Sequence, residues 1–164
     1  MTMQSELSET IKSRLGSAVI SIEEMKNFDL MIAVRKDQIV SAAGILKNDS
    51  ELRFTTLMNH LGADYMDSMA VIYNLYSPLW KRKITFKCLL DREQPEIDSL
   101  EPVFRGISWY ERETFDMLGI RFIGHHNLKR LLLPEDWEGF PLKKDYVYPE
   151  EYQGIKTARK DMLE

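Results

Sequence analysis

The residues of this chain best suited to chemistry are three carboxylates that lie close together in its second half. Glu111, Glu113 and Asp116 fall within about two helical turns of one another, and paired carboxylates can serve in acid–base catalysis. On a helix, however, Arg112 lies four residues from Asp116, and Glu113 lies three residues from it. This spacing favours a network of ion pairs over two carboxylates with widely separated pKa values.

Histidine and cysteine give little support for a metal site. His125 and His126 are adjacent, and adjacent side chains diverge on both helices and strands, while His60 is distant in the sequence. Cys88 is the single cysteine, which excludes an internal disulfide and a cysteine-ligated zinc or iron–sulfur site. It stands on the apolar side of an alternating run and is expected to be a buried thiol. We therefore expect no metal ligands.

Sequence motifs for nucleophilic catalysis and nucleotide binding are also missing. The chain contains no GxSxG elbow beside its histidines. Its glycines are scattered and form neither GxGxxG nor GxxxxGK[ST]. Enzymatic chemistry within this chain is therefore not expected, and the sequence assigns it no catalytic or cofactor-binding residue.

Charge and hydropathy restrict the partners of the chain. Among 164 residues, 22 Lys and Arg stand against 26 Asp and Glu, a formal net charge of −4. A protein that binds nucleic-acid phosphates normally has a basic excess or a basic stripe, so no nucleic-acid partner is expected. No apolar stretch approaches the ~20 residues of a membrane-spanning helix, and the first residues do not resemble a secretory signal. We expect contact with a membrane only through partner proteins.

The periodicity of apolar residues predicts an α+β (α/β-like) fold. It consists of an N-terminal mixed β-sheet with helices packed on one face, followed by an irregular C-terminal extension. The expected strands are residues 18–22, 29–34, 69–76 and 83–90, the last two forming a hairpin about Ser77-Pro78. The expected helices are residues 6–15, 36–46, about 51–62 and about 98–118.

The longest expected helix carries two capping-box spacings. Asp98 precedes Glu101 by three residues and Ser108 precedes Glu111 by three, so the helix is expected to break and restart near Gly106. Gly119 is expected to end it. The chain then divides into an α/β domain of residues 1–118 and an extended partner-binding tail of residues 119–164, one structural unit overall. Residues 155–163 form either a short helix or a frayed end.

The composition changes from Trp109 to Tyr148, where aromatic residues, glycines, prolines and charges alternate with little periodicity. Aromatic and arginine side chains are enriched where proteins dock. A strap packed on its own domain has a similar composition. The residues alone leave these two interpretations open.

This segment contains a long signature, ERETFDMLGIRFIGH at residues 111–125 followed by LKRLLLPEDWEGFPLKKDY at residues 128–146. It resembles the signature of the C-type subunit of NADH:quinone oxidoreductase, respiratory complex I. The preceding hairpin and helix are arranged as in that family, so the resemblance extends from about Asp29 to Tyr148.

The resemblance implies a cofactor-free subunit of the peripheral arm of a membrane-bound NADH:quinone oxidoreductase. Such a subunit belongs to a translocase but does not itself catalyse. It supports the quinone-reducing, terminal iron–sulfur region in electron transfer coupled to proton translocation. The implied partners are the quinone-site (D-type) hydrophilic subunit and the iron–sulfur subunits, with FMN and iron–sulfur clusters held by partners. The implied location is the cytoplasmic (or stromal or matrix-equivalent) face of an energy-converting membrane.

Roles for individual residues follow from the same resemblance. The helix from Glu111 to Asp116 sets ion pairs, Gly124-His125 makes a tight turn, and Lys144-Asp145 locks the crossing strap. Trp137 and Phe140-Pro141 anchor the partner. The expected partner interface comprises Glu111, Arg112, Glu113, Asp116, Gly124, His125, Arg130, Trp137, Phe140, Pro141, Lys144 and Asp145.

Two alternatives remain open. The first is the equivalent scaffold subunit of another complex, because relatives of this subunit also serve in ferredoxin-linked quinone reductases and in membrane-bound hydrogenase or formate-hydrogenlyase complexes. The second is a free-standing interaction module unrelated to redox chemistry. The electron donor, the quinone and the pumped ion are not encoded in this chain.

Overall fold

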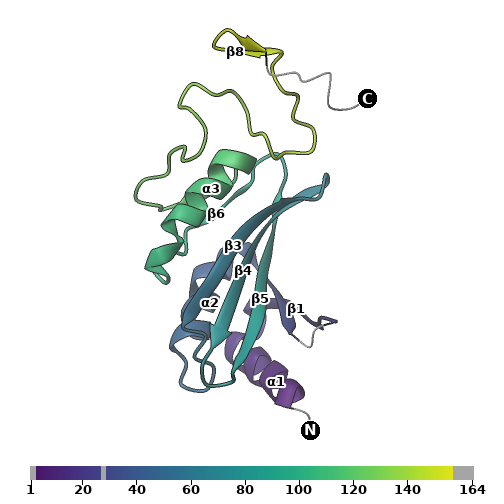
Figure 1. The fold of residues 1–164 in the computed structure, drawn as a ribbon. Helices are drawn as coiled ribbons and strands as arrows, with labels where there is room; N and C mark the ends of the chain where they lie inside the picture. Colours follow the sequence, from purple (N-terminus) through teal and green to yellow (C-terminus); the bar gives the residue numbers. More distant parts are fainter. Residues whose placement is uncertain (1–2, 27–28, 157–164) are drawn as a thin grey trace.

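A computed structural model describes residues 3–26 and 29–156 of the chain (Figure 1). The helices are α1 (Met3–Leu15), α2 (Ile39–Asn48) and α3 (Ser108–Leu118), with short 3-10 turns at Gly16–Ala18, Lys36–Gln38 and Arg105–Ile107. The strands are β1 (Val19–Glu24), β2 (Leu30–Val34), β3 (Thr56–Asp64), β4 (Ser68–Ser77), β5 (Arg82–Asp91), β6 (Glu96–Asp98), β7 (Arg121–Ile123), β8 (Glu151–Tyr152) and β9 (Ile155–Lys156).

The main sheet has five strands in the order β1-β2-β5-β4-β3. Strands β2 and β5 are parallel and the other pairs are antiparallel. Alternation along β5 buries Ile84, Phe86, Cys88 and Leu90, which confirms the predicted hairpin and the buried thiol. Burial raises the pKa of Cys88 to about 11, so the thiol is unreactive at neutral pH.

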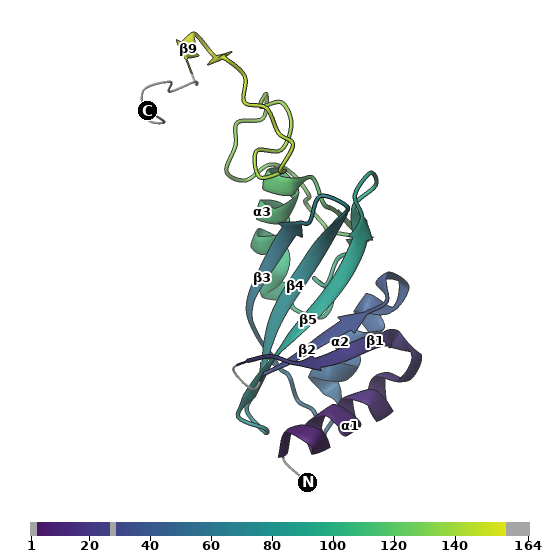
Figure 2. The same cartoon turned by 90° about the vertical axis from the view of Figure 1, so that its right-hand side faces the viewer.

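The helices pack against one side of the sheet, and among the described residues no helix lies on the opposite side (Figures 1 and 2). Helix α3 approaches β3 closely because Gly62 has no side chain. A Cβ at Gly62 would lie 2.5 Å from Leu118 Cδ1 and 2.6 Å from Thr114 Cγ2. The mixed sheet with helices on one face confirms the predicted α+β class.

The helix predicted over residues 51–62 is wrong, because this segment forms a turn and then strand β3. Arg53 adopts a positive φ of 48°, which interrupts any helix. Leu52 and Phe54 are fully buried in the turn, and from Thr56 onward the chain pairs with β4. The apolar residues therefore serve two different elements rather than one helical face.

The helix predicted over residues 98–118 is about half as long as expected. Residues 96–98 form β6, which pairs in parallel with β7, and the α-helix begins at Ser108. The predicted end is confirmed, since Gly119 caps α3 in the left-handed conformation with φ +76°. Neither capping box forms: Ile107 is the N-cap residue, with no side-chain hydrogen bond.

Beyond β7 the chain forms the tail, defined here as residues 124–156. Apart from the two-residue pair β8–β9, the tail has no helix and no strand. For residues 155–163 we predicted either a short helix or a frayed end. Ile155–Lys156 instead form β9, and residues 157–163 lie outside the described part. Strand β7 pairs with β6, and the predicted boundary after residue 118 stays a prediction.

Candidate functional site

The tail is attached to the domain by Asp116, whose carboxylate is fully buried on α3. Arg130 Nη1 donates to Asp116 Oδ1 at 2.7 Å. The backbone N–H groups of residues 131–133 donate to Oδ2 at 2.7–2.9 Å. Burial alone would raise the pKa of Asp116, but these donors outweigh it and hold the pKa below its ordinary value. We call Asp116 with Arg130 the Asp116 anchor.

Arg130 also fastens the middle of the tail. Its Nη2 donates to the carbonyl oxygens of Trp137 at 2.7 Å and Gly139 at 3.0 Å. Just beyond, the ring of Phe140 covers Gly119, where a Cβ would lie 2.7 Å from the ring. The guanidinium of Arg130 therefore connects Asp116 on helix α3 to the backbone at residues 137 and 139. Gly119 leaves room for the ring of Phe140.

Glu111 acts inside the domain. Its carboxylate is fully buried and accepts hydrogen bonds from Ser99 Oγ at 2.6 Å and Leu100 N at 2.9 Å. Burial raises the pKa of Glu111 to about 7, although the two donors act in the opposite direction. Glu111 thus connects α3 to the segment after β6.

A second attachment lies further along the tail, at residues 144–145. Arg92 donates to both carboxylate oxygens of Asp64 at 3.0–3.2 Å and of Asp145 at 2.8–3.1 Å. Lys144 N donates to Asp64 Oδ2 at 3.0 Å. Arg92 holds the pKa of Asp64 far below its ordinary range. We call these residues the Arg92 anchor.

The ion pair expected between Arg112 and Asp116 is not formed. Arg112 instead donates to the carbonyl oxygens of Lys129 and Arg130 at 3.2 and 2.9 Å, and its guanidinium lies over the ring of Trp109. Glu113 points into solvent. The helix carboxylates therefore have three separate environments rather than one shared network.

The expected interface residues fall into three groups by exposure. Glu111 and Asp116 are buried by the chain itself. The half-buried members are Arg112, His125, Arg130, Trp137, Phe140 and Pro141. Exposed members are Glu113, Gly124, Lys144 and Asp145. Gly124 has φ +79° and a hydrogen bond joins His125 N to Phe122 O, so the predicted tight turn is confirmed. Contact of any of these residues with a partner stays a prediction.

Trp137 packs within the tail. Its ring lies 4.9 Å from that of Tyr152, centroid to centroid. Its Nε1 is buried and has no hydrogen-bond partner among the described residues. Beside it, Asp136 accepts from Tyr152 Oη at 2.6 Å. This cluster folds the end of the tail back onto residues 136–137.

The sequence interpretation missed the tail residues that present most apolar surface. These are Leu132, Leu142, Val147, Tyr148 and Ile155, with exposed fractions from 57% to 85%. Their type was visible in the sequence, but without periodicity nothing indicated which side chains point outward. Arg92 was also missed, because it stands alone in a polar loop with no local pattern.

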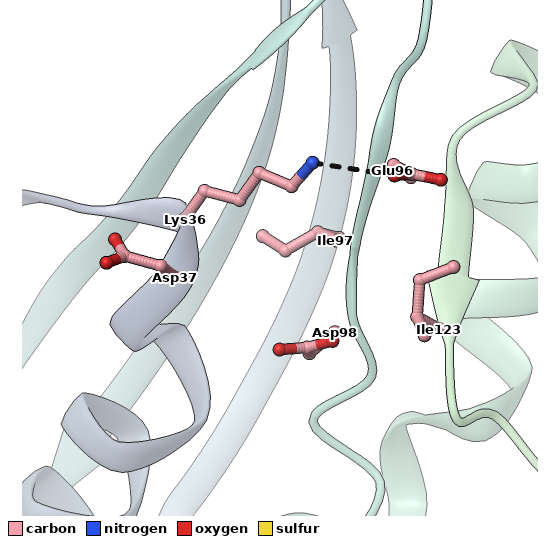
Figure 3. Close-up of a pocket in the computed structure, with 6 residues that line it drawn as sticks. All are labelled: Lys36, Asp37, Glu96, Ile97, Asp98 and Ile123. Carbon is pink, nitrogen blue, oxygen red and sulfur yellow. Dashed lines mark ion pairs between the residues drawn. The ribbon is translucent and has the colours of Figure 1, made fainter.

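The surface has three hollows of about 310–400 Å³ among the described residues. The first, about 400 Å³, lies between the Lys36–Gln38 turn and β6 and is lined by Lys36, Asp37, Glu96, Ile97, Asp98 and Ile123 (Figure 3). The second, about 310 Å³, lies between the tail and the loop before β6 and includes Phe140 and Lys143. The third, about 350 Å³, includes Lys47 and Arg105. None of the three is lined by a histidine or a cysteine.

Within residues 3–26 and 29–156, no helix is long and apolar enough to cross a membrane.

Sequence comparison identifies relatives over most of the chain. The family model for the respiratory-chain NADH dehydrogenase 30 kDa subunit matches residues 32–152. The C subunit of NADH-quinone oxidoreductase from Roseiflexus sp. (strain RS-1) is 41% identical over 140 residues, covering 84% of this chain and 80% of that protein. The J subunit of NAD(P)H-quinone oxidoreductase from Synechococcus sp. (strain WH7803) is 58% identical over 73 residues, covering 44% and 40% of the two chains.

Two solved structures share the fold. A trypsin-resistant fragment of Nqo5 superposes with a TM-score of 0.64 at 22% identity, covering 77% of this chain and all of the fragment. A chain of an archaeal respiratory membrane complex, the membrane-bound sulfane sulfur reductase, superposes with a TM-score of 0.74 at 18% identity, covering 87% and 85%. With the family model spanning more than half of the sequence, the chain belongs to the family of the 30 kDa, C-type subunit of respiratory-chain NADH dehydrogenase.

Proposed function

We propose that this chain is a cofactor-free subunit in the peripheral arm of a membrane-bound NADH:quinone oxidoreductase. Its task is to hold the quinone-site (D-type) subunit and the neighbouring iron–sulfur subunits in place. FMN and the iron–sulfur clusters belong to those partners, and the chain sits on the cytoplasmic, or equivalent, side of the membrane. Family membership supports assignment to this complex. The exposed apolar side chains of the tail support the scaffolding role.

The observation that carries this proposal is the outward apolar surface of the tail. The two anchors hold residues 130–145 against the domain. Leu132 and Leu142 in this segment, and Val147 two residues after it, remain 60–85% exposed. Exposed apolar side chains on an ordered segment are typical of a surface that another protein covers. We therefore assign the partner contact to these side chains, together with the half-buried Trp137 and Phe140.

The electron donor is set by other subunits. We propose NADH, because the Roseiflexus relative, which matches most of this chain, is named for NADH. A ferredoxin-linked or hydrogenase-type complex is the alternative, because the signature at residues 111–146 also resembles the corresponding subunits of such complexes. A native gel of solubilised membranes, stained separately with NADH and with reduced ferredoxin, distinguishes them by which donor stains the band containing this chain.

The scaffolding role is tested by replacing the exposed apolar residues of the tail. The double variant Leu142→Asp and Val147→Asp is expressed in a host that lacks its own copy of this subunit. We expect the assembled complex, measured on a native gel, and membrane NADH:quinone activity to fall at least about tenfold, because buried carboxylates oppose docking.

The matched control is Leu79→Asp, since Leu79 is 53% exposed in the turn between β4 and β5, at the end of the sheet away from the tail (Figure 1). Circular dichroism of each purified variant shows whether the domain is still folded. Full assembly of the double variant would contradict the assignment of the tail, and recovery of the wild-type chain outside any large complex would contradict the function.

A further inference from the structure

Three side chains that the proposed function does not use meet at the start of the tail. They are Glu101, His125 and His126. Strands β6 and β7 are parallel and end side by side, with Asp98 opposite Ile123. The segments that follow the two strands therefore begin at the same end of this two-stranded sheet. This brings a residue near position 100 beside residues near position 125.

The turn after β7 directs both imidazoles to the same side. Gly124 is in the left-handed region with φ +79°, and His126 and Asn127 also lie in a turn. The rings of His125 and His126 are stacked in this turn, with centroids 5.2 Å apart and planes inclined by 15°. The divergence expected for adjacent side chains does not apply at this turn.

The three side chains present donor atoms of the kind that bind transition metals. His126 Nδ1 lies 2.5 Å from Glu101 Oε1. Glu101, His125 and His126 each offer one ligand atom, and these three atoms all lie within 4.8 Å of one another. The side chain of His126 is 64% exposed and that of Glu101 is 20% exposed, so an ion can enter from solvent.

The surroundings of His125 already resemble the outer shell of a metal site. Its Nε2 lies 3.2 Å from the carbonyl oxygen and 3.0 Å from the hydroxyl of Ser108. Its Nδ1 accepts the backbone N–H of Asn127 at 3.0 Å. A metal-binding histidine commonly donates its other ring N–H to a carbonyl, which fixes the tautomer and the ring. To bind an ion through Nδ1, His125 therefore needs to give up only the hydrogen bond that Nδ1 accepts from Asn127 N.

We propose that Glu101, His125 and His126 form a binding site for one borderline first-row divalent cation, represented by Zn²⁺. Two imidazole nitrogens and one carboxylate oxygen suit Zn²⁺ at ligand distances of about 2.0–2.2 Å, with water in the fourth position. The ion inserts between His126 Nδ1 and Glu101 Oε1, which move apart from their present 2.5 Å, and the ring of His125 turns toward it by a small side-chain movement. Bound there, it fastens the first turn of the tail to the segment after β6.

The test is calorimetric titration of the metal-free full-length chain with Zn²⁺ alone. We expect one ion per chain, with affinity falling at least about tenfold in His126→Ala and in Glu101→Gln. X-ray absorption of the loaded wild type should show only nitrogen and oxygen ligands. The matched control is Glu113→Gln, an exposed carboxylate outside the cluster, which should bind Zn²⁺ as the wild type does.

Two results would overturn the proposal. One is the absence of saturable Zn²⁺ binding to the wild-type chain. The other is equal affinity of the wild type and both ligand variants, which would place the ion elsewhere. Circular dichroism of each variant without metal distinguishes loss of the site from loss of the fold, and Glu101→Asp, which keeps the carboxylate, should retain part of the affinity. The result does not depend on assembly with other subunits.

Discussion

Asp116 is a buried charge whose two carboxylate oxygens both accept hydrogen bonds from one segment of the same chain. Oδ1 binds Arg130, and Oδ2 binds three successive backbone N–H groups. A buried carboxylate with this many donors is stable as an anion, whereas removing it leaves a guanidinium and three N–H groups without their acceptor. At the scale of single residues, the tail depends on this side chain.

Replacing Asp116 by alanine should therefore lower the free energy of unfolding by about 3–5 kcal/mol, the usual cost of breaking a buried ion pair. Urea denaturation followed by circular dichroism measures this change. Glu113→Ala, an exposed acid on the same helix, should stay within about 0.5 kcal/mol of the wild type. A change below about 1 kcal/mol for Asp116→Ala would contradict the anchor.

The raised pKa of Glu111 predicts that the free energy of unfolding falls as the pH rises. Its pKa is about 7 in the folded chain and about 4.5 ordinarily, so the folded state keeps a proton that the unfolded state releases. Its contribution to stability is therefore complete below pH 4.5 and decreases as the pH rises to 7. Relative to Glu111→Gln, which has no ionisable group here, the wild type should lose about 2–3 kcal/mol between pH 5 and pH 8.

Urea denaturation of both proteins at the two pH values measures this difference. A constant difference between wild type and Glu111→Gln would show that the carboxyl is ionised throughout.

At the scale of elements, the packing of α3 on β3 depends on one missing side chain. Gly62→Ala places a methyl group 2.5 Å from Leu118 Cδ1 and 2.6 Å from Thr114 Cγ2. We expect the free energy of unfolding to fall by about 1–3 kcal/mol, as for other overpacked cores. Thermal unfolding measures it.

Gly44 in α2 is the matched comparison, because a Cβ there meets nothing within 4 Å. Gly44→Ala should stabilise the chain by about 0.5–1 kcal/mol through helix propensity. Opposite changes in the free energy of unfolding from the same glycine-to-alanine replacement would show that the local packing at each position decides the effect. Equal changes would contradict the close approach of α3 to β3.

How much could be predicted from the sequence also depends on the element. The β4–β5 hairpin was predicted because both strands alternate cleanly, and the end of α3 because Gly119 is a helix terminator. Strand β3 was missed because its pairing with β4 overrides the local pattern. In the site, the signature identified Asp116 and Arg130, but their mutual contact spans fourteen residues and is visible only in three dimensions.

At the scale of the whole molecule, the two anchors attach the tail at separate places, the end of α3 and the end of β3. Arg92→Met removes the second anchor and leaves the first intact. Amide hydrogen exchange should then become at least about tenfold faster at Lys144, whose N–H donates to Asp64. Exchange in β4 and β5 should stay unchanged.

Arg35→Met provides the control, since Arg35 forms an ion pair with Asp37 on the exposed surface, far from the tail in sequence. Slow exchange at Lys144 in the Arg92 variant would show that the tail is held without this anchor.

The attached tail also has a consequence for how fast and how tightly the chain associates. A segment that orders only on binding loses conformational entropy at that moment, and its affinity per unit of interface area is reduced accordingly. Here the Asp116 and Arg92 anchors have ordered residues 130–145 beforehand. A partner therefore meets a preorganised surface, so its affinity depends on the apolar contact itself, and substitutions that loosen an anchor should weaken docking without touching a single interfacial atom.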